Sequence, residues 1–345
     1  MLKPALRRVW RDESTLQLGL TPAHAVMLTG LTAQERSVLA LLDGSRDVTA
    51  IVDAASEAGV EPNVPPRLLD TLTSARVLDD NASARPAIGE DDRQRLEPDL
   101  LSLSLRYAGP GAAMSVLGKR QDAAVAVHGN GRVGATIAML LAAAGLGTLH
   151  CVDRAPLRCA DLGPGGIRQI ATTTRGKATA KRAAAMSASI RVGVEHRSPV
   201  TLAVLAPGSS GGLPELLADV RHQPHLVAQV CETTGAIGPL VIPGRTPCLR
   251  CVALARGDRD PQWPLIAAQL SGAGVVTEAC DVTLATLVAT LTAMQVLDYI
   301  DDVERPATLA GVIEYDLGAG TLRRRSVRAH PLCGCGADTL EPTLA

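Results

Sequence analysis

The sequence predicts two parts: a small α+β unit of winged-helix type, then a larger Rossmann-like α/β unit with a structural zinc site. Three observations support this prediction. Short alternating strands precede helical periodicity in residues 1–82, and a glycine-rich turn joins an apolar strand to an apolar helix at 123–144. Two close cysteine pairs follow, at 248–251 and 333–335. The length of 345 residues also fits about two domains.

The N-terminal unit, 1–82, is expected to contain three strands followed by three helices. The strand segments are 8–11, 15–19 and 24–28. Thr32 with Glu35 three residues later predicts a capped first helix, Asp47 can cap a second, and Pro66 can open a third. Three strands with three helices are typical of a winged-helix domain.

Residues 83–120 are predicted to be a linker, because the segment is rich in Ala, Pro, Gly and acidic residues near its start. The α/β unit then covers 121–345. Its first strand, 123–127, is an uninterrupted apolar run typical of a strand buried on both faces. The other expected elements are strands at 148–152, 202–205 and 226–230, a helix at 282–300, and a hairpin at 308–316 and 321–327.

The glycine-rich turn is a candidate nucleotide site. It reads Gly-Asn-Gly-Arg-Val-Gly at 129–134, and an aspartate follows 19 residues after its last glycine. Glycines let a backbone approach phosphates, a helix N-terminus favours their charge, and the acid can bond a ribose hydroxyl. The alternative is a strand–helix–strand unit whose glycines serve only tight packing. The candidate cofactor-binding residues are Gly129, Gly131, Arg132, Gly134 and Asp153.

The cysteine pairs predict a closed metal site. Cys248 and Cys251 are spaced as C-x-x-C, and Cys333 and Cys335 as C-x-C. Four thiolates suit tetrahedral Zn²⁺ and leave no open position, so the ion would be structural. The alternative is two pairs of unrelated thiols.

Composition excludes several classes of function. The net charge is −1 and aromatic residues make up 1%, which argues against a nucleic-acid-binding protein. The winged-helix pattern suggests a third hypothesis, a DNA-binding regulator. Residues 1–82 carry 8 Lys+Arg against 11 Asp+Glu, so this unit would attract DNA phosphates weakly. The apolar stretch 282–297 is short and contains threonines, so we expect a buried helix rather than a membrane span. No secretory signal is visible, and we expect a cytoplasmic protein whose cysteines are not paired as disulfides.

Residues 123–337 resemble the E1-like superfamily, the adenylating enzymes related to ThiF. The resemblance includes the glycine turn, Ala-Gly-Leu-Gly at 144–147, Asp153, Pro-Cys-x-x-Cys at 247–251, Ala-Met-Gln at 293–295 and the final cysteine pair. It implies an ATP and Mg²⁺ site, a structural zinc and a homodimer.

Residues 1–82 resemble a RiPP recognition element, the winged-helix module that binds leader peptides of ribosomally made natural products. The segments 42–44 and 238–244 also look like the fused ThiF-like proteins of azol(in)e-containing peptide clusters. In that family the protein presents the precursor to a YcaO-type cyclodehydratase. A leader would add as a strand beside the third strand and contact the third helix. The candidate peptide-binding residues are Ala25, Val26, Met27, Leu28, Leu68, Leu69, Leu72 and Thr73.

The chain departs from the E1-like pattern where phosphates are held. The family's Asn-x-x-Arg element is replaced by Asp-Leu-Gly-Pro at 161–164, and the magnesium aspartate is missing from 206–210. The family's lysine position falls near Thr179. We therefore predict a leader-recognition scaffold with a degenerate adenylation site and no catalytic residues. The alternative is an active ATP-dependent adenylyltransferase with a peptide substrate, for which the replacement cations would be Arg132, Arg168, Arg175 and Lys177.

Overall fold

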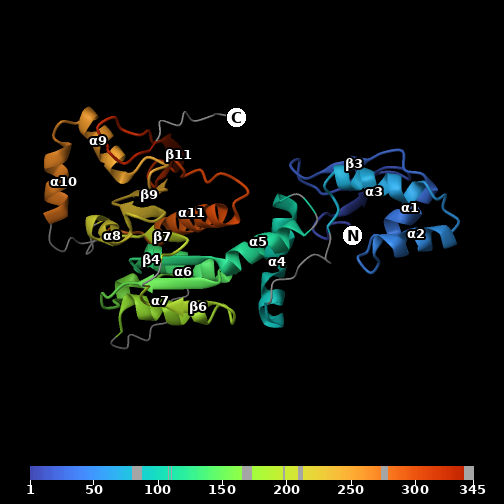
Figure 1. Ribbon diagram of the computed structural model, residues 1–345, viewed down its shortest axis with the longest axis horizontal. Coiled ribbons are helices and arrows are strands. Elements are labelled where there is room, and N and C mark those ends of the chain that lie inside the picture. Colours follow the sequence, from blue (N-terminus) through green and yellow to red (C-terminus); the bar gives the residue numbers. More distant parts are fainter. Residues whose placement is uncertain are drawn as a thin grey trace. The chain divides into compact units, whose positions relative to one another are not determined.

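The protein divides into two compact units, Met1–Gly118 and Lys119–Ala345 (Figure 1). The computed structural model describes residues 1–79, 88–107, 109, 111–164, 173–196, 199–208, 213–272 and 279–337. Two helices, α4 (Glu90–Arg106) and α5 (Ala112–Asp122), occupy the predicted linker.

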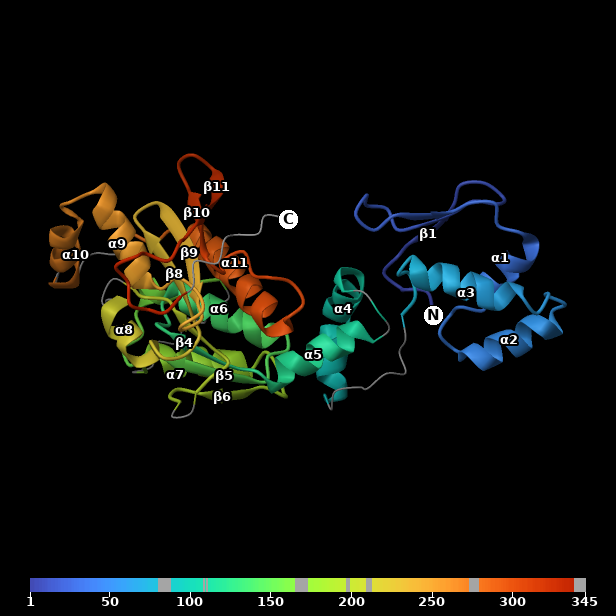
Figure 2. The same ribbon diagram turned by 45° about the horizontal axis from the view of Figure 1, so that its top comes forward.

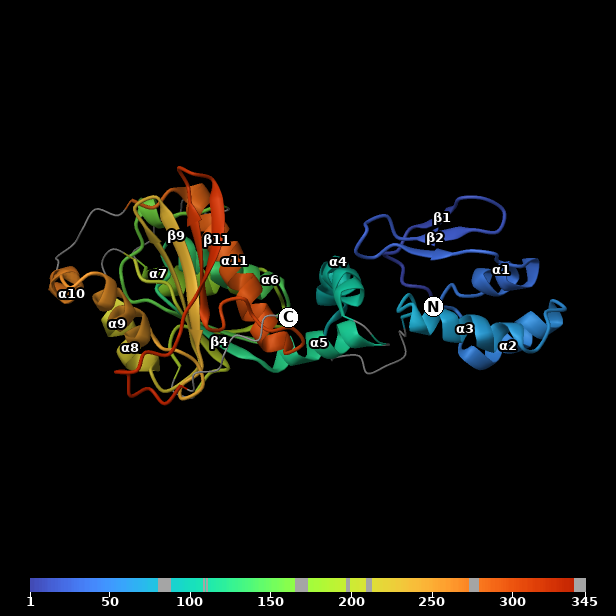
Figure 3. The same cartoon turned by 90° about the horizontal axis from the view of Figure 1, so that it is seen from above.

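The N-terminal unit is a three-stranded antiparallel sheet with its helices on one side (Figure 3). Its strands follow one another in the order β1-β2-β3, so β3 forms an edge. The strands are β1 (Arg8–Trp10), β2 (Leu16–Leu18) and β3 (Val26–Leu28). The helices are α1 (Ala33–Ala40), α2 (Val48–Glu57) and α3 (Val64–Ser74). The three strands and three helices expected from the pattern are present, and their winged-helix classification stays an interpretation.

The helix starts in this unit follow their local signals. Thr32 and Glu35 form a complete capping box at α1, and the Asp47 side chain accepts a hydrogen bond from the Ala50 N–H at α2. The third helix begins at Val64, earlier than Pro66. Pro65 tolerates this start because the first turn of a helix needs no N–H donor from it.

The C-terminal unit is built on one mixed sheet of eight strands in the order β11-β10-β9-β8-β7-β4-β5-β6. Strands β8, β7, β4, β5 and β6 are parallel, while β9, β10 and β11 are antiparallel. The strands are β4 (Ala124–His128), β5 (Thr148–Val152), β6 (Arg191–Gly193), β7 (Leu202–Leu205), β8 (His225–Cys231), β9 (Thr234–Val241), β10 (Gly311–Asp316) and β11 (Thr321–Ser326). This arrangement confirms the Rossmann-like α/β prediction.

Helices cover both faces of this sheet. On one face α6, α7 and α11 enclose the main core, and α11 runs beside α6 (Figure 2). On the other face α8 packs on β7 through leucines, and Leu249 of α9 joins the same cluster. The helices are α6 (Arg132–Ala143), α7 (Arg175–Ala184), α8 (Leu213–Val220), α9 (Leu249–Arg259), α10 (Trp263–Gly272) and α11 (Val282–Asp301).

Strand β9 was not predicted from the sequence, because its two glycines and its proline disfavour a strand. Its neighbours explain the glycines. A Cβ on Gly235 would lie 2.3 Å from the Val288 side chain of α11, so only glycine lets the helix approach. Gly238 has φ +106° and faces the Gly311 carbonyl, which also excludes a side chain.

Helix α11 is long and apolar enough to cross a membrane by length and composition, and it is the one such helix among the described residues. It lies instead within the main core, as expected from the sequence, with Val288, Ala289 and Val296 fully buried. Its last residue, Asp301, accepts two hydrogen bonds from Arg120, at 2.8 and 2.7 Å, and both side chains are buried. This ion pair fixes the end of α11 to α5.

Candidate functional site

The glycine-rich turn lies between β4 and α6, at the carboxyl end of the parallel strands, where nucleotides bind in such sheets. Gly129 has φ +86°, and a Cβ there would lie 2.1 Å from the Ala206 carbonyl oxygen. A Cβ on Gly134 would lie 1.8 Å from the Gly129 oxygen. These two glycines are therefore required by packing of the turn itself.

Gly131 differs from the other two glycines. It is the N-cap of α6, with φ −72°, and an added Cβ would meet nothing within 4 Å. Its backbone thus faces open space at a helix N-terminus, where the helix dipole and free N–H groups attract anions. The shape required to hold a phosphate is preserved at this position.

Asp153 follows β5 and lies beside the turn, as the sequence predicts for a ribose-binding acid. Its carboxylate accepts hydrogen bonds from the backbone N–H of Asn130 at 2.7 Å and of Ala155 at 2.8 Å. The guanidinium of Arg175 lies 3.9 Å away. The carboxylate therefore has partners within the protein.

Arg175 is one of the cations that the sequence offers for binding phosphates, but in the structure it pairs with a carboxylate of the protein. It is buried, and its Nε donates to Asp161 at 2.9 Å. Asp161 also accepts a hydrogen bond from the Arg158 N–H at 2.8 Å. Arg175 therefore balances the negative charge of Asp161.

The other three candidate cations lie in different environments. Arg132, at the start of α6, donates to the backbone oxygens of Ala160 at 2.7 Å and Cys280 at 2.6 Å. Lys177 is exposed in the first turn of α7, and Arg168 lies outside the described residues. Ala206, whose carbonyl oxygen lies against Gly129, follows the end of β7. Of the four candidate cations, Arg132 and Arg175 are therefore bonded within the protein.

Three histidines next to the turn form a cluster that sequence reasoning missed. The Nε2 atoms of His128 and His196 lie 3.3 Å apart, and the rings of His150 and His196 have centroids 5.5 Å apart. Burial, followed by the nearby His196, lowers the pKa of His128 to about 4. His128 is therefore neutral at pH 7. Its place at the end of β4 follows from the sequence, but its neighbours come from β5, which carries His150, and from the segment after β6, which carries His196.

The four cysteines come together as the spacing predicts. Cys248 precedes α9, Cys251 lies in its first turn, and Cys333 and Cys335 lie in the segment after β11. The Sγ atoms are 3.9 Å apart for Cys248 and Cys251, and 3.6 Å apart for Cys248 and Cys333 and for Cys251 and Cys335. Tetrahedral zinc with bonds of about 2.3 Å places its sulfurs about 3.8 Å apart. This cluster has the geometry to bind a metal ion such as zinc.

His330 stands beside the cluster without joining it. Its Nε2 is 2.8 Å from the Asp258 carboxylate of α9, and its Nδ1 accepts the Leu332 N–H at 3.1 Å. This contact fixes the loop that carries the second cysteine pair. Cys280 packs against the main core.

The predicted peptide-binding residues separate into two groups. Leu28, Leu68 and Leu72 belong to the core of the N-terminal unit, with Leu72 fully buried. Val26 and Leu69 are half-buried beside it, whereas Ala25 and Thr73 are exposed and Met27 is 53% exposed. A cavity of about 310 Å³ lies at the start of β3 and the end of α3, lined by His24, Ala25 and Val26 together with 75–77.

Comparison with known proteins reveals the fold. No family model matches the sequence, and a search of the curated proteins gives no match. The structure is similar to the microcin C7 biosynthetic enzyme MccB in complex with N-formylated MccA, with a TM-score of 0.67, 16% identity and coverage of 98% of this chain and 99% of that chain. E. coli MccB with ATP gives a TM-score of 0.67 at 16% identity over 97% and 98% of the two chains, and PaaA gives 0.68 at 16% over 94% and 99%. The chain therefore shares the fold of these proteins over 94–98% of its length.

Proposed function

We propose that this protein recognises the leader of a ribosomal precursor peptide and presents it to a YcaO-type cyclodehydratase in azole or azoline peptide biosynthesis. The observation that carries this proposal is the agreement with MccB over both units, because MccB is seen in complex with the MccA peptide. An E1-like protein preceded by a small unit with an open sheet edge suits a peptide substrate. We also propose a bound structural zinc and a homodimer.

The edge of β3 is the proposed leader site. Among the described residues β3 pairs with β2 alone, so its other edge can accept a peptide as an added strand. The exposed Met27 and the half-buried Val26 and Leu69 would contact leader side chains, next to the 310 Å³ cavity. Leu68 and Leu72 would support the groove from within the core.

The proposal assigns no adenylation chemistry to the chain. Stabilising a transferring phosphoryl group depends on cations and metal ions placed around it. Here Arg132 and Arg175 are bonded to backbone oxygens and carboxylates, and Ala206 supplies no metal ligand. The residues of the turn fit a nucleotide in shape but offer little charge to hold its phosphates.

An active ATP-dependent adenylyltransferase acting on a peptide is the second candidate. Two observations favour it: the open space at Gly131, and the similarity to MccB with ATP. When bound, the nucleotide would supply the adenylyl group. The backbone N–H groups at Gly131 and at the N-terminus of α6 would donate hydrogen bonds to its phosphates. The Asp153 carboxylate would orient its ribose.

Calorimetric titration of Mg·ATP into the zinc-loaded full chain separates the two candidates. The scaffold predicts no binding up to millimolar nucleotide, whereas the enzyme predicts micromolar binding. Gly131→Val is the matched variant, because its side chain enters space that is otherwise open and the fold should be unaffected. Micromolar binding of Mg·ATP that is abolished by Gly131→Val would establish the hypothesis of an active adenylyltransferase.

Leader binding is tested separately by fluorescence anisotropy with labelled synthetic leader peptides of candidate precursors. Met27→Asp should weaken binding at least tenfold, because a charge would enter the proposed groove. Val48→Asp is the control, since Val48 is also exposed in this unit but lies on α2. An unchanged affinity in Met27→Asp, or an equal loss in both variants, would reject the proposed groove.

A further inference from the structure

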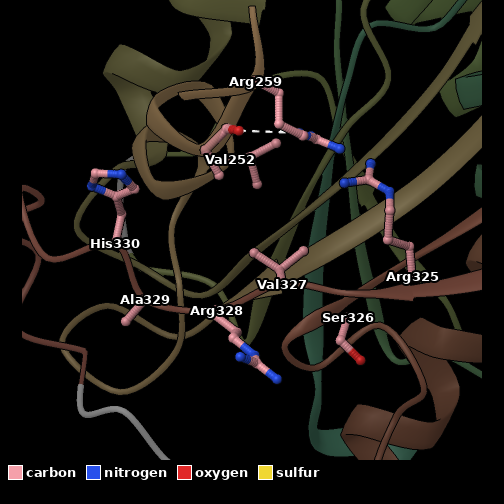
Figure 4. Close-up of a pocket in the computed structure, with 9 residues that line it drawn as sticks. Val252, Arg259, Arg325, Ser326, Val327, Arg328, Ala329 and His330 are labelled. Carbon is pink, nitrogen blue, oxygen red and sulfur yellow. Dashed lines mark hydrogen bonds between the residues drawn. The ribbon is translucent and has the colours of Figure 1, made fainter. Parts of the chain in front are cut away.

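The C-terminal unit contains a cavity whose lining includes no residue of the glycine-rich turn. A cavity of about 270 Å³ is formed between α9 and the chain that continues from β11 (Figure 4). Val252 and Ala255 of α9 face Val327 and Ala329 across it, and Arg259, Arg325 and Arg328 also line it. Its lining is apolar with basic groups at the rim.

Two of the three arginines that line the cavity have no carboxylate partner among the described residues, and the carboxylate of Asp258 beside it is bonded to His330. Figure 4 shows the side chains of Arg259 and Arg325 ending close together at one side of the cavity. Arg325 is paired with Glu314 at 2.8 Å, but Arg259 bonds only to the backbone oxygen of Ala255 within the described chain. Arg328 is exposed and has no carboxylate within 4.0 Å among the described residues. Like charges placed together attract an anion, and guanidinium groups bind carboxylates with two parallel hydrogen bonds.

A second cavity of about 170 Å³ adjoins the first, and Val252 and Arg325 line both. Trp263 and Leu249 line this second cavity. The Trp263 Nε1 is buried and has no hydrogen-bond partner in the described structure. Arg256 lies over the indole ring at 4.8 Å and holds it in place. The indole ring therefore forms a fixed apolar part of the lining of the second cavity. We call the two cavities together the α9 groove.

We propose that the α9 groove binds a peptide segment that combines acidic and aliphatic residues. A carboxylate would lie against Arg259 and Arg328, and an aliphatic side chain would enter the cavity between Val252 and Val327. Charge complementarity favours an acidic peptide, and the apolar lining disfavours a bare inorganic anion or a nucleic-acid backbone. The inference concerns the C-terminal unit and does not depend on the leader site proposed at β3.

Fluorescence anisotropy with the full zinc-loaded chain tests this proposal. The probe is a labelled synthetic peptide of alternating Glu and Val, and the matched peptide carries Gln in place of Glu. The Glu peptide should bind at least about tenfold more tightly. Arg259→Ala and Arg328→Ala should each weaken its binding, and the double variant at least about tenfold. Arg323→Ala is the control, because Arg323 is exposed on β11 but does not line the cavity.

A second readout does not depend on charge. In a Trp10→Phe variant, Trp263 is the single tryptophan of the chain, and Trp10 is exposed in the N-terminal unit. Binding of the Glu peptide should change the emission of Trp263 at the concentration that changes the anisotropy.

Several results would overturn the proposal. One is binding of the Gln peptide as tight as that of the Glu peptide. Another is a loss of affinity in Arg323→Ala as large as that in Arg259→Ala and Arg328→Ala. The third such result is a Trp263 emission that does not change on binding. Displacement of the peptide by millimolar inorganic phosphate or by single-stranded RNA, as effectively as by unlabelled peptide, would assign the rim to phosphate groups instead. A loss caused by Met27→Asp would place the peptide at β3 and not at α9.

Discussion

The sheets of the two units differ in how their strands follow the chain, although both units contain contacts between distant residues, such as the bridge between Leu2 and Leu78. In the N-terminal unit the strands pair in chain order, and the helix caps join residues three positions apart, such as Thr32 and Glu35. In the C-terminal unit β4 lies between β5 and β7, Arg120 pairs with Asp301 and Cys251 meets Cys335. The second unit therefore depends on a few contacts between distant parts of the chain, and single changes should damage it more.

Loss of the metal should produce the largest effect. Cys251 is fully buried in the cluster that joins α9 to the segment after β11. Cys251→Ser, or removal of zinc by a chelator, should cost a large part of the about 10–16 kcal/mol with which zinc-finger peptides hold their ion. Thermal unfolding and zinc content per chain measure this.

Cys231→Ser is the control, since Cys231 is exposed and outside the cluster. An unchanged melting temperature in Cys251→Ser would contradict a structural role for zinc at this cluster.

Breaking the buried ion pair should give the next largest effect. Asp301→Ala would leave Arg120 buried without its carboxylate, which costs about 3–5 kcal/mol. The exposed pair Arg154 and Glu195 is the matched comparison, and Glu195→Ala should cost less than about 1 kcal/mol. Urea unfolding of both variants measures the difference, and similar costs for the two would contradict the importance assigned to the long-range pair.

Acid should destabilise the C-terminal unit through His128. Burial lowers the pKa of His128 from 6.5 to about 4, so the unfolded chain binds this proton more readily than the folded one. Stability should therefore be complete above pH 6.5 and fall as the pH decreases toward 4. The loss would reach about 3 kcal/mol if His128 acted alone.

His128→Asn should flatten this dependence in denaturant unfolding measured from pH 7 to pH 4.5. The groups that face His128 are His196, which lowers its pKa further, and Asp219, which raises it. A His196→Ala variant should thus reduce the acid sensitivity partly. If His128→Asn keeps the full acid loss, the dependence comes from other groups.

The same difference in range explains what could be predicted from the sequence. The caps at Thr32 and Asp47 and the strands at 148–152 and 202–205 are encoded locally, and the structure has them as expected. The cysteine cluster was also accessible, because thiol spacing is a strong signal even between distant segments. Two contacts could not be predicted from the sequence: the pairing of Arg175 with Asp161 and the contact of His128 with His196. The side chains in these contacts come from separate elements and meet only after the sheet forms. Strand β9 was missed because its glycines are required by α11 and β10 and not by β9 itself.

The N-terminal unit should show the smallest effect, at its best-defined cap. Thr32→Ala removes the side chain that accepts the Glu35 N–H and should cost about 1 kcal/mol. Ser37→Ala is a suitable control on the same helix, because its hydroxyl bonds only to the Ala33 carbonyl of the turn before it. Hydrogen exchange of α1 amides in the full chain distinguishes the two variants and reports this unit separately from the C-terminal one. A loss confined to α1 and its neighbours would show that this unit unfolds independently. Faster exchange in β4 or α11 as well would show that the two units share one cooperative transition, and the contrast in range would then not set their stabilities.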